Sequence, residues 1–129
     1  MRIRTTRLTA TMAALGAVAA FALVGCSAPA TSSVAGTWQE HPAPEAGEVP
    51  ELVLTANGEL SGTDGCNSLA GGWTSSGATV TFSDVAATLM ACEGVDEWLL
   101  DLSTGTISGD TLTILDASGA VIGELHRVA

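Results

Sequence analysis

Short runs of alternating apolar and polar residues, separated by turn sequences, make up most of the chain after Val34. Such alternation is typical of a strand with one face in a core and the other in solvent. In "ATVTF", for example, Val80 and Phe82 share one face. Asn57-Gly58 lies between two such runs and predicts a type I′ hairpin, because both central residues of that turn need positive φ. The expected strands cover residues 34–38, 51–55, 59–63, 69–74, 78–82, 106–109, 111–115 and 120–128.

One segment, Val95–Ser103, departs from this alternation of apolar and polar residues. Trp98, Leu99 and Leu102 recur there at helical spacing, and two acidic residues stand at its start, where the helix dipole favours them. The sequence therefore predicts a single short α-helix. The fold class that follows is mainly β with one α-helix: an antiparallel sheet curled into a small barrel, with the helix covering an open end or face.

The N-terminus has the pattern of a secretory signal peptide. Three arginines in "MRIRTTR" precede the apolar run "LTATMAALGAVAAFALV". The run ends in "LVGC", Leu23–Cys26, which has the form of a lipobox, and the Cys26 thiol would take a diacylglyceryl group before cleavage. An uncleaved transmembrane anchor is the alternative, but threonine and alanine dilute the run and its length is marginal for a span of about 20 residues.

Three parts of the chain follow from this pattern. We expect a lipoprotein signal peptide over residues 1–25, the lipidated Cys26 with a flexible tether over 26–33, and one small domain over 34–129. The protein is then anchored by lipid to the cell membrane, outside the cytoplasm, and the membrane is its expected partner. We expect the domain to be a monomer.

Charge excludes one large class of partner. The whole chain has a formal net charge of −10 and no lysine. Loss of the signal peptide leaves Arg127 as the one arginine against 14 acidic residues. This negative field repels phosphate backbones, so we expect no nucleic-acid partner. The proline-rich acidic loop from His41 to Glu51 is a candidate surface for a basic envelope protein that the sequence does not identify, although a solvated loop is the simpler interpretation.

Two cysteines remain once Cys26 carries lipid. Cys66 and Cys92 then form an even pair in an exported, disulfide-permissive setting, which most often means a bridge. The chain-entropy model gives such a bridge about 3–4 kcal/mol of stabilisation, a large share for so small a domain.

The glycine-rich stretch "LSGTDGCNSLAGGW", residues 60–73, has parts that a catalytic loop also uses. A cysteine nucleophile needs a nearby base, and the two histidines, His41 and His126, stand in no recognisable pairing motif. The cysteines and histidines lack the close-paired spacing of zinc sites, and the stretch lacks the regular ligands of a calcium loop and the lysine of a P-loop. We therefore expect no catalytic residue, metal or cofactor.

A structural interpretation of the same stretch uses fewer assumptions. Gly62 and Gly65 suit a sharp exit from a strand, while Asp64 and Asn67 suit hydrogen bonds to neighbouring backbone amides. The loop then positions Cys66 for its partner.

Several motifs, in order, resemble the META domain of HslJ-like envelope proteins. They are "GTW" at residues 36–38, the Gly-Cys-Asn signature in "SGTDGCNSLAGGW", "TLMAC" at 88–92, "EWL" at 97–99 and "GDTLTILDASG" at 109–119. The residues that match the family motif are Gly62, Gly65, Cys66, Asn67, Met90 and Cys92. Trp73 and Leu89 depart from the family's common tyrosine and arginine, which weakens any polar site there.

The resemblance implies a compact conical antiparallel barrel with one helix and no agreed catalytic residues. It also implies a loosely described role in envelope stress, drug tolerance, secretion or virulence. The function we expect is therefore a surface-tethered, non-enzymatic envelope lipoprotein that acts as an accessory in envelope stress, drug tolerance or secretion. A small lipocalin-like ligand carrier is the alternative, because "GTW" also resembles the start of lipocalins. An envelope hydrolase is the third interpretation.

Overall fold

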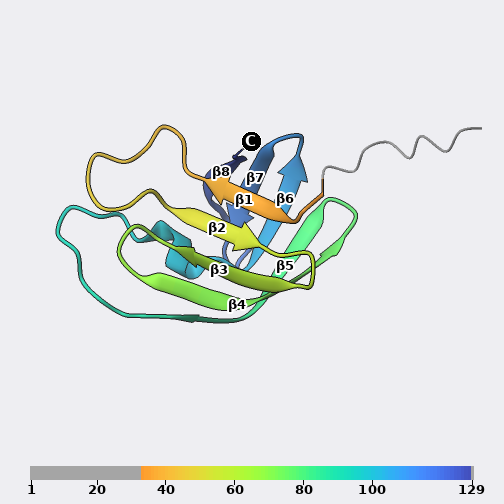
Figure 1. The fold of residues 1–129 in the computed structure, drawn as a ribbon, viewed down its shortest axis with the longest axis horizontal. Helices are drawn as coiled ribbons and strands as arrows, with labels where there is room; N and C mark the ends of the chain where they lie inside the picture. The colour runs from red at the N-terminus through yellow and green to blue at the C-terminus, as the bar shows by residue number, and fades with distance from the viewer. Residues whose placement is uncertain (1–32, 129) are drawn as a thin grey trace, which may run out of the picture.

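Eight antiparallel strands form a closed barrel in which each strand pairs with its neighbours in chain order (Figure 1). The computed structural model describes residues 33–128, so the predicted signal peptide, Cys26 and most of the tether lie outside the described residues. The strands are β1 (Gly36–Gln39), β2 (Glu51–Leu54), β3 (Glu59–Thr63), β4 (Ser68–Ser76), β5 (Thr79–Ala87), β6 (Thr104–Ser108), β7 (Thr111–Leu115) and β8 (Val121–Arg127). The predicted mainly β, antiparallel barrel is confirmed.

Hairpins connect most of the strands, and β8 returns to β1 to close the barrel. Asn57-Gly58 joins β2 to β3 as expected, but the predicted type I′ turn is wrong, because Gly58 has a positive φ of +89° and Asn57 does not. The closing seam is short, because β1 and β8 pair only through Trp38↔Arg127 and Gln39↔His126. The first and last strands of the domain therefore lie side by side.

The β4–β5 hairpin is longer than the alternation pattern predicts. Both strands have nine residues, and a register shift between Ala70 and Gly72 marks a bulge. Beyond the bulge, β5 continues through Asp84, whose φ is +51°, to pair Ala87 with Leu69. Bulges bend a strand locally and increase its twist, so this hairpin bends where the barrel turns.

The core consists of side chains from the inward face of the strands. Its fully or nearly fully buried members are Trp38, Leu52, Leu54, Leu60, Leu69, Val80, Phe82, Leu99, Leu112, Ile114 and Leu125. Burial alternates along β2 and β7 with the period of two that their sequences show. Hydrophobic side chains thus fill the middle of the barrel.

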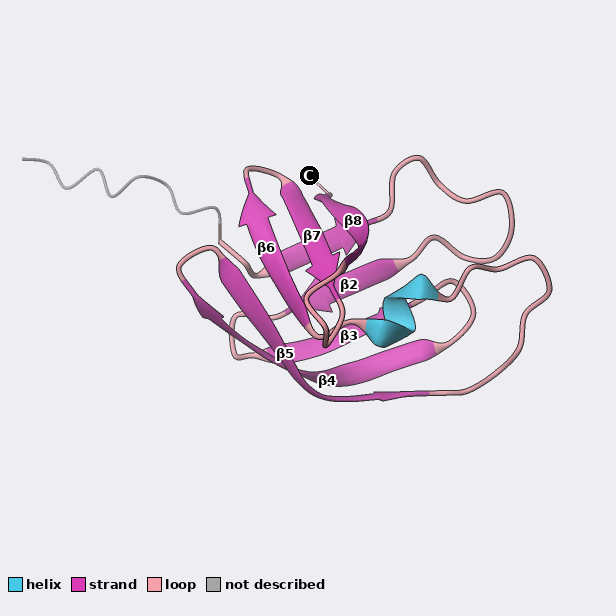
Figure 2. Cartoon of the chain, turned by 180° about the vertical axis from the view of Figure 1, so that it is seen from behind, coloured by secondary structure: helices cyan, strands magenta, loops and turns pink. Residues whose placement is uncertain are grey.

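The predicted covering α-helix is wrong. In its place the chain forms one 3₁₀ turn, η1 (Trp98–Asp101), shown in cyan in Figure 2. The bonds that hold it run from the Leu100 N–H to the Glu97 carbonyl and from the Leu102 N–H to the Leu99 carbonyl. Within residues 33–128 no helix has the length and apolar character needed to span a membrane.

One constraint on each side of this segment keeps it from becoming an α-helix. Glu97 caps η1 with no side-chain hydrogen bond, so the first turn gains no stabilisation from its N-cap. On the other side, Ser103 enters the sheet: its N–H donates to the Leu115 carbonyl and its carbonyl accepts from the Phe82 N–H. The segment that remains is too short for a stable α-helix, because several turns are needed to offset the unfavourable free energy of forming the first one.

The short turn still closes one end of the barrel. Leu99 is fully buried in the core. Trp98 packs directly on Gly123 of β8, where an added Cβ would lie 2.5 Å from its ring. The helical spacing in the sequence correctly marked apolar contacts, although a 3₁₀ turn makes them.

Candidate functional site

The Gly-Cys-Asn turn after β3 is built around one fully buried carboxylate. Asp64 Oδ1 accepts a 2.7 Å hydrogen bond from the Cys66 N–H and another from the Asn67 N–H, and Oδ2 accepts from Asn67 Nδ2 at 3.1 Å. Gly65 sits in this turn at φ +102°, a conformation that other residues rarely adopt. Asp64 therefore shapes the turn by bonding to the backbone two and three residues on.

Asn67 connects this turn to the segment that follows β5. Its Oδ1 accepts hydrogen bonds from the Met90 N–H at 2.6 Å and from the Thr88 hydroxyl at 3.1 Å, while its Nδ2 donates to the Met90 carbonyl at 3.4 Å. Asn67 is fully buried, so these bonds satisfy polar atoms that water does not reach. Met90 as a residue is 56% exposed, and its contacts with Asn67 are made by its backbone.

A disulfide fastens the same two segments. Cys66 and Cys92 are bonded, with their Cα atoms 5.9 Å apart. This is the pairing that the sequence predicts, and it leaves neither thiol free. Gly62, the remaining motif residue, lies in β3 opposite Leu52 and Leu69, where a Cβ would come within 2.1 Å of the Glu51 carbonyl. The six motif residues thus join two loops that lie far apart in the chain.

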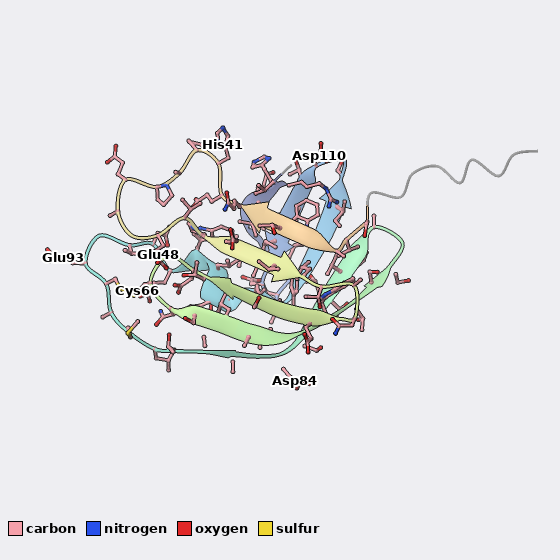
Figure 3. All side chains as sticks on the ribbon, in the orientation of Figure 1. His41, Glu48, Cys66, Asp84, Glu93 and Asp110 are labelled. Atoms are coloured by element: carbon pink, nitrogen blue, oxygen red, sulfur yellow. A yellow bond between two sulfur atoms is a disulfide. The ribbon has the colours of Figure 1, made fainter. Side chains whose placement is uncertain are left out.

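A pocket of about 330 Å³ lies where these loops meet a third. Its walls come from the loop between β1 and β2 (residues 40–50), from the Asp64 turn and from residues 94–98. Figure 1 shows the first and third loops extending from the same side of the barrel, and in Figure 3 Glu48 and Cys66 lie close together there. The Glu48 N–H donates to the Gly65 carbonyl at 3.0 Å, which ties the first wall to the second.

Carboxylates dominate the polar part of this pocket. Five acidic residues line it, namely Glu40, Glu45, Glu48, Asp64 and Asp96. Its apolar part includes Trp98, Val95 and Pro50. The lining contains no lysine, arginine or histidine. Among residues 33–128 the one ion pair lies elsewhere, between Arg127 and Asp110 at 3.4 Å.

The two histidines, which the sequence places in no pairing motif, lie next to each other in space. The ring centroids of His41 and His126 are 6.3 Å apart in an edge-to-face arrangement. His41 lies just beyond β1, and His126 is the β8 partner of Gln39, so the closing seam brings them together. Only knowledge that β1 pairs with β8 would have revealed this. Within the described part of the chain no group of three or more potential ligands forms a metal site.

Arg127 completes the same seam. Its guanidinium lies 4.2 Å from the Trp38 ring centroid, a favourable cation–π distance. The guanidinium also donates to the Ala35 and Ser33 carbonyls, at 3.3 Å and 2.6 Å. This arginine therefore holds the beginning of the domain against its last strand.

The comparison with protein families agrees with this architecture. The META domain model matches residues 30–127, and the chain belongs to the META domain family. No curated protein and no solved structure matches the chain significantly.

Proposed function

We propose that this META-domain protein is a non-enzymatic, lipid-anchored accessory protein of the cell envelope that acts by binding. One observation carries the proposal: the Gly-Cys-Asn loop, which has the parts of a catalytic loop, uses all of them to join two segments. Asp64 and Asn67 are engaged in hydrogen bonds, and Cys66 is bonded to Cys92. A nucleophile needs a free thiol beside a base, and this loop supplies neither.

The sequence supports the anchor. The Leu23–Cys26 lipobox follows a basic and then an apolar segment, and only seven residues separate Cys26 from Val34. A lipidated Cys26 would hold the domain at the outer face of the membrane, with roles in envelope stress, drug tolerance or secretion. Two or more acyl chains bind a bilayer far more durably than one.

The filled core favours this proposal over a lipocalin-like carrier. A carrier needs an interior cavity between its sheets or strands. Here Trp38, Leu112 and Leu125 are fully buried inside the barrel together with the other core side chains. Binding at a surface pocket fits this arrangement better than binding within the barrel.

Fractionation tests the anchor. The native protein should sediment with membranes and need detergent for release, whereas Cys26→Ala should not be processed as a lipoprotein. Mass spectrometry of the mature N-terminus reports the lipid directly. A mature protein without lipid on Cys26 would contradict the anchor.

A double substitution tests the non-enzymatic role. His41→Ala/His126→Ala removes both imidazoles that could act as a base, and the cellular phenotype of a deletion strain should still be complemented. Thermal unfolding of the purified variant shows whether it is folded. Loss of complementation by a folded double variant would contradict the proposal and point to catalysis.

A further inference from the structure

We propose that the end of β5 and the residues that follow it bind an extended segment of a partner protein as an added strand. This surface, residues 87–91, is called the open edge below. The partner segment has uncharged, strand-forming residues in its middle and basic residues at its ends. The inference deepens the proposed binding role, on which it rests, by adding a second surface to the pocket and naming the chemistry of its partner.

The second half of β5 has a strand on one side only. β6 pairs with β5 from Thr79 to Thr81, and the Phe82 N–H then donates to the Ser103 carbonyl. β5 continues to Ala87, paired with β4 along its other side. Within residues 33–128 no strand pairs with this second half on the side away from β4. A sheet edge of this kind presents N–H and carbonyl groups to an incoming strand.

The hydrogen bonds of Thr88 and Met90 show which side of the chain faces inward. The Thr88 N–H donates to the Ser68 carbonyl of β4 at 3.2 Å. Two residues later, the Met90 N–H and carbonyl both bond to the side chain of Asn67, which takes the place of a β4 residue. The even-numbered residues therefore use their backbone groups toward β4 and the Gly-Cys-Asn turn.

The odd-numbered residues face the opposite way. In an antiparallel pair, residues bonded to the neighbouring strand alternate with residues whose backbone groups point to the other side. Ala87, Leu89 and Ala91 hold these alternate positions. Within the described chain, neither the N–H nor the carbonyl of Leu89 or Ala91 bonds to another backbone group. The open edge thus offers donors and acceptors at the spacing that a strand requires.

The sequence leaves this edge unprotected. Natural proteins block exposed edges with charges, prolines or bulges. The bulge and the positive φ of Asp84, +51°, guard only the beginning of the segment. From Val85 to Cys92 the chain has no charged residue, no proline and no glycine. An incoming strand therefore meets no barrier along the open edge.

An exposed apolar side chain selects the middle of the partner segment. Val85 and Ala87 are half-buried and pack against the core. Leu89 follows on the same face by the period of two, but it lies beyond the core and is 87% exposed. Neighbouring strands place their side chains next to one another on each face. Apolar or β-branched residues of a partner strand would therefore cover Leu89.

Two acidic residues select the ends of the partner segment. Asp84 and Glu93 flank the uncharged run, and both are exposed. In Figure 3 they lie on the outer rim of the molecule, one at each end of this stretch. Basic residues at the ends of a partner strand would complement them. A second copy of the chain is disfavoured, because each mature copy has one arginine against 14 acidic residues and the copies repel each other.

The open edge is held in place before a partner arrives. Asn67 bonds both backbone groups of Met90, and the disulfide to Cys66 fastens Cys92 two residues later. A preorganised surface loses less conformational entropy on binding. The extended shape of this segment therefore favours the addition of a strand.

Matched synthetic peptides test the partner chemistry. The purified mature protein in non-ionic detergent micelles is titrated with the capped peptide KKVTVTVKK, with EEVTVTVEE and with KKVTPPVKK. The two prolines remove N–H groups from both sides of the peptide strand while keeping its charge. NMR follows amide chemical shifts and amide hydrogen exchange. KKVTVTVKK alone should give saturable shifts at residues 84–93 and slow the exchange of the Ala87, Leu89 and Ala91 amides.

Three results would overturn the proposal. Equal binding of KKVTPPVKK would mean that charge alone attracts the peptide, and equal binding of EEVTVTVEE would remove the role of Asp84 and Glu93. Absence of saturable shifts at millimolar KKVTVTVKK would reject the open edge as a peptide site. Slow exchange of the Ala87, Leu89 and Ala91 amides without peptide would mean that a second copy or the micelle already covers the edge.

Proline substitution tests the site on the protein. Ala87→Pro removes an N–H that points away from β4, a position at which an edge strand tolerates proline. It should weaken KKVTVTVKK binding about tenfold or more, through the lost hydrogen bond and the added ring, whereas Ala87→Ser keeps the N–H and should bind as the native protein does. Equal binding by Ala87→Pro and Ala87→Ser would reject pairing at the edge.

A second proline pair covers the case in which Ala87→Pro does not fold. Leu89→Pro lies beyond β5, so it leaves the β4–β5 pairs intact, and Leu89→Val is its control. Leu89→Pro should also weaken KKVTVTVKK binding about tenfold. Equal affinities of Leu89→Pro and Leu89→Val would overturn the proposal.

These outcomes are separate from those of the proposed function. Failure of peptide binding leaves lipidation of Cys26 and the histidine test unchanged, because neither depends on the open edge. Loss of complementation by the histidine variant, with intact peptide binding, would reject the non-enzymatic role alone.

Discussion

The side chain of Asn67 holds the backbone of Met90 across 23 residues of sequence. Asn67 Oδ1 accepts a 2.6 Å hydrogen bond from the Met90 N–H, and its Nδ2 donates to the Met90 carbonyl. The carboxamide thus copies the pairing of a neighbouring strand, with one donor and one acceptor aimed at the same residue. Met90 then leads directly to Cys92, so this contact and the disulfide act on the same loop.

Replacing Asn67 by alanine should cost about 2–3 kcal/mol of folding free energy, because the buried Asp64 Oδ2 and the partly buried Met90 N–H lose their partner. For a domain of this size the melting temperature should fall by about 10 °C or more. Differential scanning calorimetry measures the change. Ser75→Ala, an exposed position on β4, is the control and should leave the melting temperature nearly unchanged. A folded Asn67→Ala protein that melts with the native one would contradict this account.

Reduction of the disulfide should destabilise the domain. Cys66 and Cys92 are 26 positions apart, and a closed loop of this length predicts about 3–4 kcal/mol. Intact-mass measurement should show the oxidised form, and reductant should lower the melting temperature by about 10 °C or more. Two alkylatable thiols in the exported native protein would refute the prediction.

Local signals in the sequence were enough to locate the β2–β3 hairpin. Asn57-Gly58 marked the position of the β2–β3 turn, although only Gly58 takes positive φ and the turn is therefore not the expected type I′. The strands beside it begin and end within a residue of their expected limits. The far part of β5 was missed because "SDVAA" lacks strand-forming alternation. Its pairing with β4 and the bulge near Gly71 form it instead.

The 3₁₀ turn and the pocket depend on contacts between segments that are distant in the sequence, and no local pattern predicts such contacts. Trp98 and Leu99 show helical spacing, but hydrogen bonds from Ser103 to two strands shorten the segment to η1. The pocket combines the loop that begins at Glu40, the turn at Asp64 and the later part of the loop between β5 and η1, and it forms only after the barrel closes. The acidic loop from His41 to Glu51 was recognised in the sequence, whereas its partners in the pocket were not.

Replacing Gly123 by alanine should displace Trp98 from the end of the barrel. The new Cβ would lie 2.5–2.7 Å from three carbons of the Trp98 ring, closer than atoms in contact approach. Overpacking of this kind costs about 1–3 kcal/mol. We expect a lower melting temperature and a red-shifted tryptophan emission as Trp98 becomes more exposed.

A double-mutant cycle supplies the control for Gly123→Ala. Trp98→Leu removes the ring, so adding Gly123→Ala to it should cost much less than Gly123→Ala costs in the native protein. Additive effects of the two substitutions would mean that the alanine methyl group clashes with something other than Trp98.

The turn between β7 and β8 should give the domain a small stabilisation near neutral pH that is lost in acid. The pKa of Asp116 is held below its ordinary value of 3.8, first by the hydrogen bond from the Ser118 hydroxyl and then by backbone N–H groups, including that of Ala120. A carboxyl whose folded-state pKa is depressed contributes stability above its unfolded pKa and loses it as the pH falls through the folded value. The melting temperature of the native protein should therefore exceed that of Asp116→Asn near neutral pH, and the difference should shrink below about pH 4.

Ser118→Ala removes the largest cause of the shift and should reduce the same difference, while Asp84→Asn, an exposed acid on β5, is the control. A difference between the native protein and Asp116→Asn that stays constant down to pH values below 3.8 would show that the charge of Asp116 is not what stabilises the turn.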